Sequence, residues 1–143
     1  LLFVSCSSSR KIKMKQNIDY FPLKTSVKID NYSICFTTTN NTSNTIKISS
    51  LKYYSNLFVQ LSSEEIELYR YKVKPIINTD KYIVLKPNQT ISFTYEKKIN
   101  EIYANIKNSQ SYELKIKFMG KIYIDNEEVI LPNEYILIQQ IKL

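Results

Sequence analysis

The sequence contains no histidine and no tryptophan, and it has only one glycine and two cysteines among 143 residues. Without histidine the chain lacks the commonest general base and the commonest metal ligand of enzymes. Nucleophilic sites that depend on a histidine base are excluded, and two cysteines are too few ligands for a zinc site. Gly120 alone does not build a phosphate-binding loop. We therefore expect no enzyme activity, no metal and no small-molecule cofactor.

Carboxylates are the remaining candidates for catalysis, and they form two small acidic clusters. Glycosidases need only two carboxyl groups, and Ca²⁺ prefers oxygen ligands, so an enzyme acting through acids alone stays open as an alternative. Both clusters lie at expected hairpin turns, where solvated acids are common, and neither has the spacing of a calcium-binding loop. Their members are Glu64, Glu65 and Glu67 in the first and Glu127 and Glu128 in the second.

Arginine is also scarce, since only Arg10 and Arg70 stand among 20 basic residues. The net charge is +7, and the segment 7–18 supplies more than half of it through Arg10, Lys11, Lys13 and Lys15, with no acid between them. A nucleic-acid-binding protein is expected to concentrate basic residues, arginine above all, on its folded surface. This distribution argues against nucleic acid as a partner. A basic segment of this kind suits the anionic head groups of a membrane.

The first residues, LLFVSC, combine an apolar run with a small residue and a cysteine. The stretch Leu2-Phe3-Val4-Ser5-Cys6 resembles the lipobox of bacterial lipoproteins, although Phe3 stands where the family usually has leucine. The resemblance implies that residues 1–5 end a signal peptide and that Cys6 carries a lipid anchor in the bacterial cell envelope, at the outer membrane. Residues 6–17 are then a basic, serine-containing tether.

Two other interpretations of Cys6 remain open from the residues alone. A bridge between Cys6 and Cys35 is one, because two cysteines permit a single pairing. In the other, residues 1–4 form a buried strand and both cysteines are structural thiols. Cys35 lies in the alternating stretch YSICFTTT, where we expect a small packed residue.

Apolar and polar residues alternate with a period of two through most of the chain after Asn17, which is typical of strands with one buried face. In SYELKIKF, Tyr112, Leu114, Ile116 and Phe118 share a face. The expected strands are 26–30, 31–39, 45–49, 56–61, 65–73, 82–85, 91–96, 111–118, 121–125, 128–131 and 135–143.

Asn-, Asp- and Ser-rich stretches separate these strands, as turns do. DNEE at 125–128 predicts a hairpin in which Asn takes a positive φ, since glycine is almost absent. Ile99, Ile102, Tyr103 and Ile106 recur at helical spacing, so we expect one short helix near 97–106 that crosses between sheets. Short strands at regular spacing predict an all-β fold, an antiparallel immunoglobulin-like β-sandwich over residues 18–143. A closed barrel is the structural alternative.

The order of features between residues 51 and 118 carries a further resemblance. YIVLKPNQTISF, then a short helical turn, then SYELKI, is similar to the immunoglobulin-like accessory sandwiches found beside deuterolysin-type zinc peptidases. The peptidase motif HExxH is missing, so the resemblance implies the non-catalytic domain alone.

Tyrosine is abundant, with 12 residues, and exposed tyrosine is favoured at protein interfaces. Tyr69 and Tyr71 share a face across Arg70, while Tyr53 and Tyr54 are adjacent; we take these four as candidate partner-binding residues. The alternative is that the rings fill the core in place of tryptophan. Ile66 and Leu68 lie on the opposite face from Tyr69 and Tyr71, so the expected strand 65–73 is covered on both sides or presents an interaction patch.

These features predict a lipid-anchored envelope protein whose sandwich binds another protein. It is expected to serve as an accessory subunit of an outer-membrane or surface assembly. The final strand, 135–143, is a candidate sheet edge for that contact. The first alternative is an inhibitor or immunity protein that blocks a peptidase or toxin with loops such as 39–44 or 74–81. A carbohydrate-binding module based on the tyrosine pairs is a second.

Overall fold

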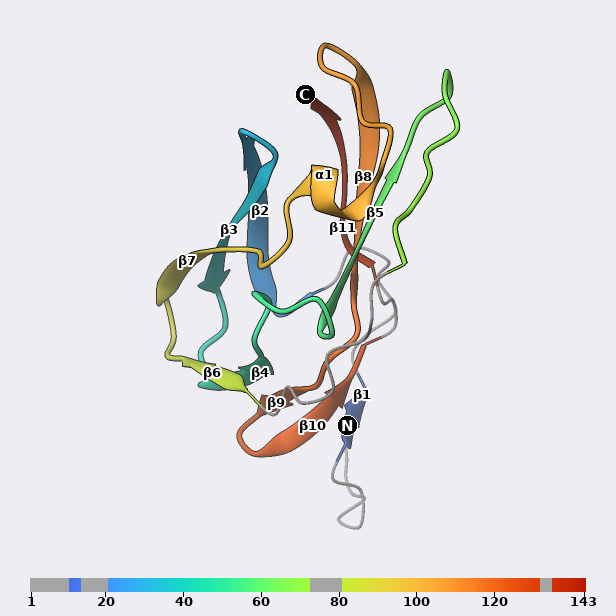
Figure 1. The fold of residues 1–143 in the computed structure, drawn as a ribbon. Coiled ribbons are helices and arrows are strands. Elements are labelled where there is room, and N and C mark those ends of the chain that lie inside the picture. The colour runs from blue at the N-terminus through green and yellow to red at the C-terminus, as the bar shows by residue number, and fades with distance from the viewer. Residues whose placement is uncertain (1–10, 14–20, 73–80, 132–134) are drawn as a thin grey trace.

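The computed structural model describes residues 11–13, 21–72, 81–131 and 135–143. These residues form an all-β, sandwich-like fold of three sheets with one short helix (Figure 1), which confirms the fold class expected from the sequence. Most of the expected strands are present, displaced by one to three residues at their ends. In chain order the elements are β1 Lys11–Lys13, β2 Leu23–Asp30, β3 Ser33–Asn40, β4 Ile46–Ser49, β5 Leu57–Ser62, β6 Tyr82–Leu85, β7 Thr90–Thr94, α1 Ile99–Ile102, β8 Ser111–Phe118, β9 Ile122–Ile124, β10 Glu127–Ile130 and β11 Tyr135–Lys142.

Two three-stranded sheets stand beside each other, and a five-stranded sheet lies across one end (Figure 1). The first, which we call the β3 sheet, has the order β2-β3-β7, and the second, the β8 sheet, has the order β11-β8-β5. The five-stranded sheet has the order β1-β10-β9-β4-β6. Helix α1 joins β7 to β8 and therefore crosses from one three-stranded sheet to the other, as the sequence predicts.

Alternation along the strands determines which side chains enter the core. In β8, Tyr112, Leu114, Ile116 and Phe118 are all buried, whereas the residues between them are half-buried. One connected cluster of buried side chains takes members from all three sheets and from α1. Burial of this apolar surface is the main driving force for the fold, at about 25 cal/mol per Å².

Asparagine and aspartate supply the backbone conformations that glycine usually supplies. The hairpin between β9 and β10 turns through Asp125 and Asn126, with φ values of 51° and 65°. Two consecutive residues with positive φ fit a two-residue hairpin loop, whose twist matches that of the flanking strands. The hairpin expected from DNEE is thereby confirmed, and Asn31 and Asn88 also have positive φ.

Two expectations are wrong. The segment 65–72 is not a strand of any sheet; it makes one isolated bridge, between Arg70 and Tyr103. Lys11–Lys13, expected within a free tether, forms β1 and pairs in parallel with β10, so the fold is not wholly antiparallel. An unpaired sheet edge presents backbone donors and acceptors, and β1 satisfies those of β10. The alternation in KIK does not show which edge this segment pairs with.

The structure describes only one of the two cysteines. Cys6 lies outside the described residues, so its lipidation and its pairing stay predictions. Cys35 is a half-buried thiol on the outer face of the β3 sheet. Its neighbours Ile34 and Phe36 are fully buried, so the pleat that turns them inward turns Cys35 outward. Among the described residues, no helix is long and apolar enough to cross a membrane.

Candidate functional site

Residues 67–71 form a segment that crosses beside the open edge of β5, and we call it the tyrosine strap. Its two tyrosines point outward: Tyr69 is 59% exposed and Tyr71 is 49% exposed. These values favour the expected surface role for both residues over a role in the core. Ile66 and Leu68 pack against the core from the other side, so the chain is apolar on both faces and only one face is covered.

The backbone of the strap is fixed to the residues around the end of α1. The Tyr71 amide donates to the Ile102 carbonyl at 2.9 Å, and the Ala104 amide donates to the Tyr69 carbonyl at 2.8 Å. The side chain of Asn105 adds two bonds, accepting from the Tyr69 amide at 2.8 Å and donating to the Glu67 carbonyl at 2.6 Å. Four hydrogen bonds over a few residues hold both tyrosine backbones in one conformation.

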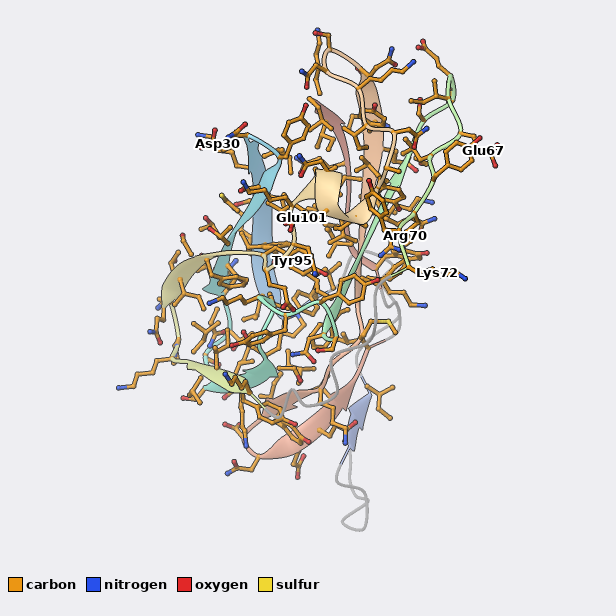
Figure 2. The ribbon with its side chains drawn as sticks, viewed as in Figure 1. Asp30, Glu67, Arg70, Lys72, Tyr95 and Glu101 are labelled. Carbon is orange, nitrogen blue, oxygen red and sulfur yellow. The ribbon has the colours of Figure 1, made fainter. Side chains whose placement is uncertain are left out.

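Arg70 fixes the strap to the β8 sheet. Its guanidinium donates to the Val59 carbonyl at 2.8 Å, to the Tyr103 hydroxyl at 2.9 Å and to the Tyr54 hydroxyl at 3.1 Å. The same group lies 4.3 Å from the centre of the Phe58 ring, within cation–π range. Figure 2 shows Glu67, Arg70 and Lys72 in succession along one margin of the molecule. The planar, five-donor guanidinium suits several fixed acceptors at once, which lysine does not.

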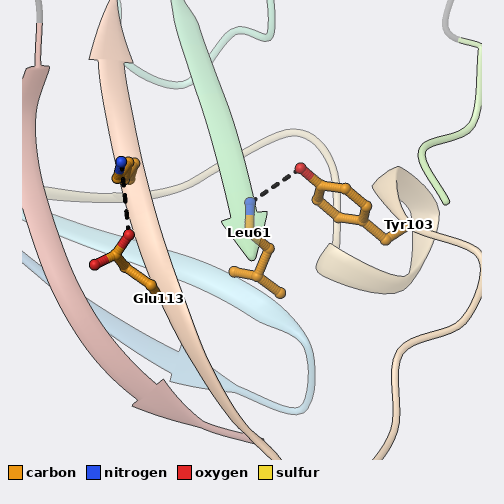
Figure 3. Close-up of polar contacts among 4 residues, drawn as sticks. Leu61, Tyr103 and Glu113 are labelled. Carbon is orange, nitrogen blue, oxygen red and sulfur yellow. Dashed lines mark hydrogen bonds and ion pairs between the residues drawn. The ribbon is translucent and has the colours of Figure 1, made fainter. Parts of the chain in front are cut away.

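Side chains occupy the free edge of β5 at three alternate positions. The Tyr95 hydroxyl donates to the Leu57 carbonyl at 2.6 Å, Arg70 donates to the Val59 carbonyl, and the Leu61 amide donates to the Tyr103 hydroxyl at 2.9 Å. The last of these bonds is drawn in Figure 3, together with the ion pair at Glu113. Edge strands left unpaired invite pairing with other chains. These three side chains protect the β5 edge.

Burial and its neighbours keep the Tyr95 hydroxyl of this cluster protonated. Burial raises the pKa of the Tyr95 phenol above its ordinary value, Tyr54 and Glu96 raise it further, and Arg70 partly opposes them. The Tyr54 amide donates to the Glu96 carboxylate. Tyr95 therefore remains a hydrogen-bond donor at neutral and moderately alkaline pH.

Tyr53 and Tyr54 belong to the turn between β4 and β5, and both are half-buried. They are not neighbours on opposite faces of a strand. Tyr54 contributes its hydroxyl to Arg70, while the Tyr53 hydroxyl accepts from Lys81 at 3.3 Å. Of the four tyrosines considered from the sequence, the structure thus joins Tyr54 to the support of the strap and leaves Tyr69 and Tyr71 as its exposed surface.

The acidic residues do not assemble into one site. Glu64, Glu65 and Glu113 line a polar hollow of about 600 Å³, together with serines and glutamines. Glu127 and Glu128 belong to β10 in the five-stranded sheet. In the part of the chain that the structure describes, no group of three or more Asp, Glu, Cys or His side chains is placed to hold a metal ion.

The loop after β3 is pinned by Asn40, which is fully buried. Its amide nitrogen donates to the Asn44 carbonyl at 2.7 Å and the Leu85 carbonyl at 2.9 Å. Its oxygen accepts from the Thr42 amide at 2.9 Å and the Thr42 hydroxyl at 2.7 Å. The exposed tip of this loop, 41–45, is therefore preorganised. The other loop considered from the sequence, 74–81, lies outside the described residues except for Lys81.

Sequence reasoning missed Arg70, Tyr103 and Asn105 as supports of the strap. The one available signal was that Arg70 is the single arginine after residue 10 in a chain rich in lysine. Comparison with known proteins adds no assignment: no protein-family model and no curated protein matches the sequence. The resemblances to lipoproteins and to accessory sandwiches stay predictions.

Proposed function

We propose that this chain is a non-catalytic lipoprotein of the bacterial cell envelope that binds another protein through the tyrosine strap. The observation that carries the proposal is the pair of exposed rings, Tyr69 and Tyr71, on a backbone held by four hydrogen bonds. A tyrosine ring offers a large contact area at a small cost in conformational entropy. A fixed backbone lowers that cost further.

The support beneath the strap favours a binding surface over a catalytic one. Arg70 donates its hydrogen bonds to Val59, Tyr103 and Tyr54, so it serves to hold the strap and not to act on a substrate. The two exposed rings are separated by Arg70 and lie on the same side. Charged Glu67, at the start of the strap, and Lys72, directly after it, are also exposed. An aromatic centre with a polar rim is typical of protein interfaces.

The anchor rests on the sequence alone. Cys6 follows an apolar run and a small residue, and Arg10, Lys11, Lys13 and Lys15 follow it. Several acyl chains together anchor a protein firmly, at about 0.8 kcal/mol for each buried CH₂. Intact mass of the membrane fraction before and after Cys6→Ser tests this part: an acylated chain that begins at Cys6 and is lost from membranes in the variant supports it. An unmodified chain that retains residues 1–5 contradicts it.

Site-directed photocrosslinking tests the binding surface. A photoreactive phenylalanine analogue replaces Tyr69 in one variant and Val84, which is 56% exposed on β6, in a matched control. We expect a discrete crosslinked protein from position 69 and none of that mass from position 84. The same product from both positions, or no product from position 69, contradicts the proposal.

The crosslinked protein then allows a quantitative test. Tyr69→Ala/Tyr71→Ala removes both rings while leaving the backbone bonds of the strap available, and truncating a tyrosine at an interface hot spot costs about 2 kcal/mol or more. We expect the dissociation constant for the identified partner to rise by about tenfold or more. Unfolding by urea serves as the control, because a change in affinity at unchanged stability assigns the effect to the surface.

A second candidate function is an inhibitor or immunity protein that acts through the loop at 41–45. The four hydrogen bonds at Asn40 favour it, because a preorganised loop loses little entropy on entering a target site. Ser43 is exposed at the loop. Under this alternative, a photoreactive phenylalanine analogue at Ser43 captures the target. Ser43→Arg then weakens binding to that target while Tyr69→Ala/Tyr71→Ala does not, so the two variants separate the two functions.

A further inference from the structure

Strand β7 forms one edge of the β3 sheet, and its sequence is Thr90-Ile91-Ser92-Phe93-Thr94. It pairs with β3 along its whole length, from Thr90 opposite Thr39 to Thr94 opposite Cys35. In Figure 1 it lies at the outer margin of the molecule. Within the described residues, no hydrogen bond joins the backbone of 90–94 to any segment other than β3.

Two other edges of the three-stranded sheets, β5 and β2, are protected. Three side chains occupy the edge of β5, as described above. Strand β2 carries exposed Lys24 and Lys28, and its Val27 carbonyl accepts from the Gln139 side chain of β11 at 3.4 Å. Charged residues and covering contacts are the usual means by which proteins prevent pairing at sheet edges. Strand β7 has no charged residue and no proline, so it lacks these devices.

The outer face of β7 continues a ladder of short hydroxyl side chains across the sheet. Thr39 and Thr90 hydroxyls lie 2.8 Å apart, and Thr37 and Ser92 hydroxyls lie 3.1 Å apart. Thr90, Ser92 and Thr94 are exposed on this face, whereas Ile91 and Phe93 are half-buried on the inner face. Each face of the strand is therefore uniform in chemistry.

The order of these residues is symmetric about Ser92. If β7 pairs in antiparallel fashion with β7 of a second copy, centred on Ser92, then Ser92 faces Ser92, Ile91 faces Phe93, and Thr90 faces Thr94. Each contact joins two hydroxyl residues on the outer face or two apolar residues on the inner face, and none joins like charges. Cross-strand pairs of these kinds stabilise sheets. Twofold symmetry of this type is the commonest arrangement of homo-oligomers.

We infer that two copies of this chain associate through β7 to form a continuous six-stranded sheet. The contact uses five residues from each copy, so it belongs to the small, weak class of interfaces and responds to protein concentration. It lies on the β3 sheet, away from the strap on the β8 sheet, so it does not depend on the proposed partner site. On a membrane, anchored chains gain effective concentration, which favours such a pairing.

Charge substitution at Ser92 tests the inference directly. Ser92→Lys places like charges opposite each other across the twofold axis, and we expect the dissociation constant of the dimer to rise by about tenfold or more. Ser26→Lys is the matched control, because Ser26 is also exposed and lies in the same row of the sheet, opposite Thr37, but on the β2 edge. Analytical ultracentrifugation of the 143-residue chain over a concentration series gives both constants.

A mixed sample guards against a variant that merely misfolds. Ser92→Lys and Ser92→Glu chains are each expected to be monomeric, whereas their equimolar mixture forms a heterodimer because opposite charges then face each other. Restored association requires both edges to be folded. Any one of three results overturns the inference: a wild-type chain monomeric throughout the series, a dimer equally strong in Ser92→Lys, or a mixture no more associated than its components.

Discussion

Arg70 donates a hydrogen bond to the hydroxyl of Tyr103 at 2.9 Å, and each of the two side chains also binds the backbone edge of β5. Tyr103 accepts from the Leu61 amide, and Arg70 donates to the Val59 carbonyl, two residues earlier on the same strand. The pair thus fastens the tyrosine strap and closes a sheet edge with the same atoms. Stability of the fold and presentation of the candidate binding surface are consequently coupled.

Removing the guanidinium should destabilise the domain. Arg70→Met keeps most of the apolar stem but leaves the Val59 carbonyl and the hydroxyls of Tyr54 and Tyr103 without this donor. We expect the free energy of unfolding to fall by about 2 kcal/mol. Tyr103→Phe tests the coupling, since a double-mutant cycle in urea should give an interaction energy of about 1 kcal/mol. Purely additive effects would show that the Arg70–Tyr103 bond does not stabilise the fold.

Tyr95 should make stability fall at high pH. Its pKa is raised in the folded protein by burial, while in the unfolded chain it titrates near 10.0. Above that value the unfolded state releases the proton and the folded state keeps it, so the contribution of Tyr95 is complete below pH ~10 and declines as the pH rises further.

Tyr95→Phe isolates this effect from other titrating groups. At pH 7 the variant loses the bond to the Leu57 carbonyl, and we expect a cost of about 1–2 kcal/mol. The difference in unfolding free energy between wild type and variant should shrink between pH 9 and pH 11, a range on either side of the ~10 at which unfolded tyrosine titrates. Chemical denaturation at several pH values measures it, and a constant difference would contradict the assignment.

Asn40 should be far less tolerant of substitution than its neighbour Asn41. Asn40→Ala removes four hydrogen bonds at a buried position, and we expect a loss of about 2–3 kcal/mol. Asn41→Ala changes an exposed residue and should remain within about 0.5 kcal/mol of wild type. Amide exchange at Thr42 and Asn44 should accelerate only in the first variant. Equal protection of both amides in the two variants would show that Asn40 does not order the loop.

Gly120 is needed for its size and not for an unusual backbone conformation. A Cβ at this position lies 2.5 Å from the Ser49 Cβ and 2.7 Å from its Oγ, closer than atoms pack. We expect Gly120→Ala to cost about 1–3 kcal/mol. In a Ser49→Gly background the same substitution should cost clearly less, because the obstructing atoms are gone. The same cost in both backgrounds would contradict a steric origin.

Much of the fold follows from alternation along the chain. SYELKIKF places Tyr112, Leu114, Ile116 and Phe118 on one face, and all four are buried in β8. The hairpin at Asp125 and Asn126 and the short helix at Ile99–Ile102 also follow from local sequence. These predictions succeed because the pleat and the tight turn are properties of a few consecutive residues.

The sequence predicted the exposed tyrosines of the candidate site but not the residues that support them. Exposure of Tyr69 and Tyr71 was one expected outcome. EIELYRYKV alternates as well as a true strand, and yet its described part, 65–72, joins no sheet. The β5 edge beside it is occupied by side chains from residues 70, 95 and 103. These side chains take the hydrogen-bonding positions that a neighbouring strand would use. Residues 95 and 103 lie far from the segment in the sequence, so its alternation does not predict their presence there.

Local geometry and composition account for the residues that turn inward on each strand, for the positions of the turns and for the lack of a histidine side chain. Contacts between distant segments account for the rest: which strands pair, which edge Tyr95, Arg70 and Tyr103 close, and that β7 is an edge strand of uncharged residues. Strand order and edge protection arise from hydrogen bonds between distant segments, and such bonds leave no periodic trace in the chain that makes them.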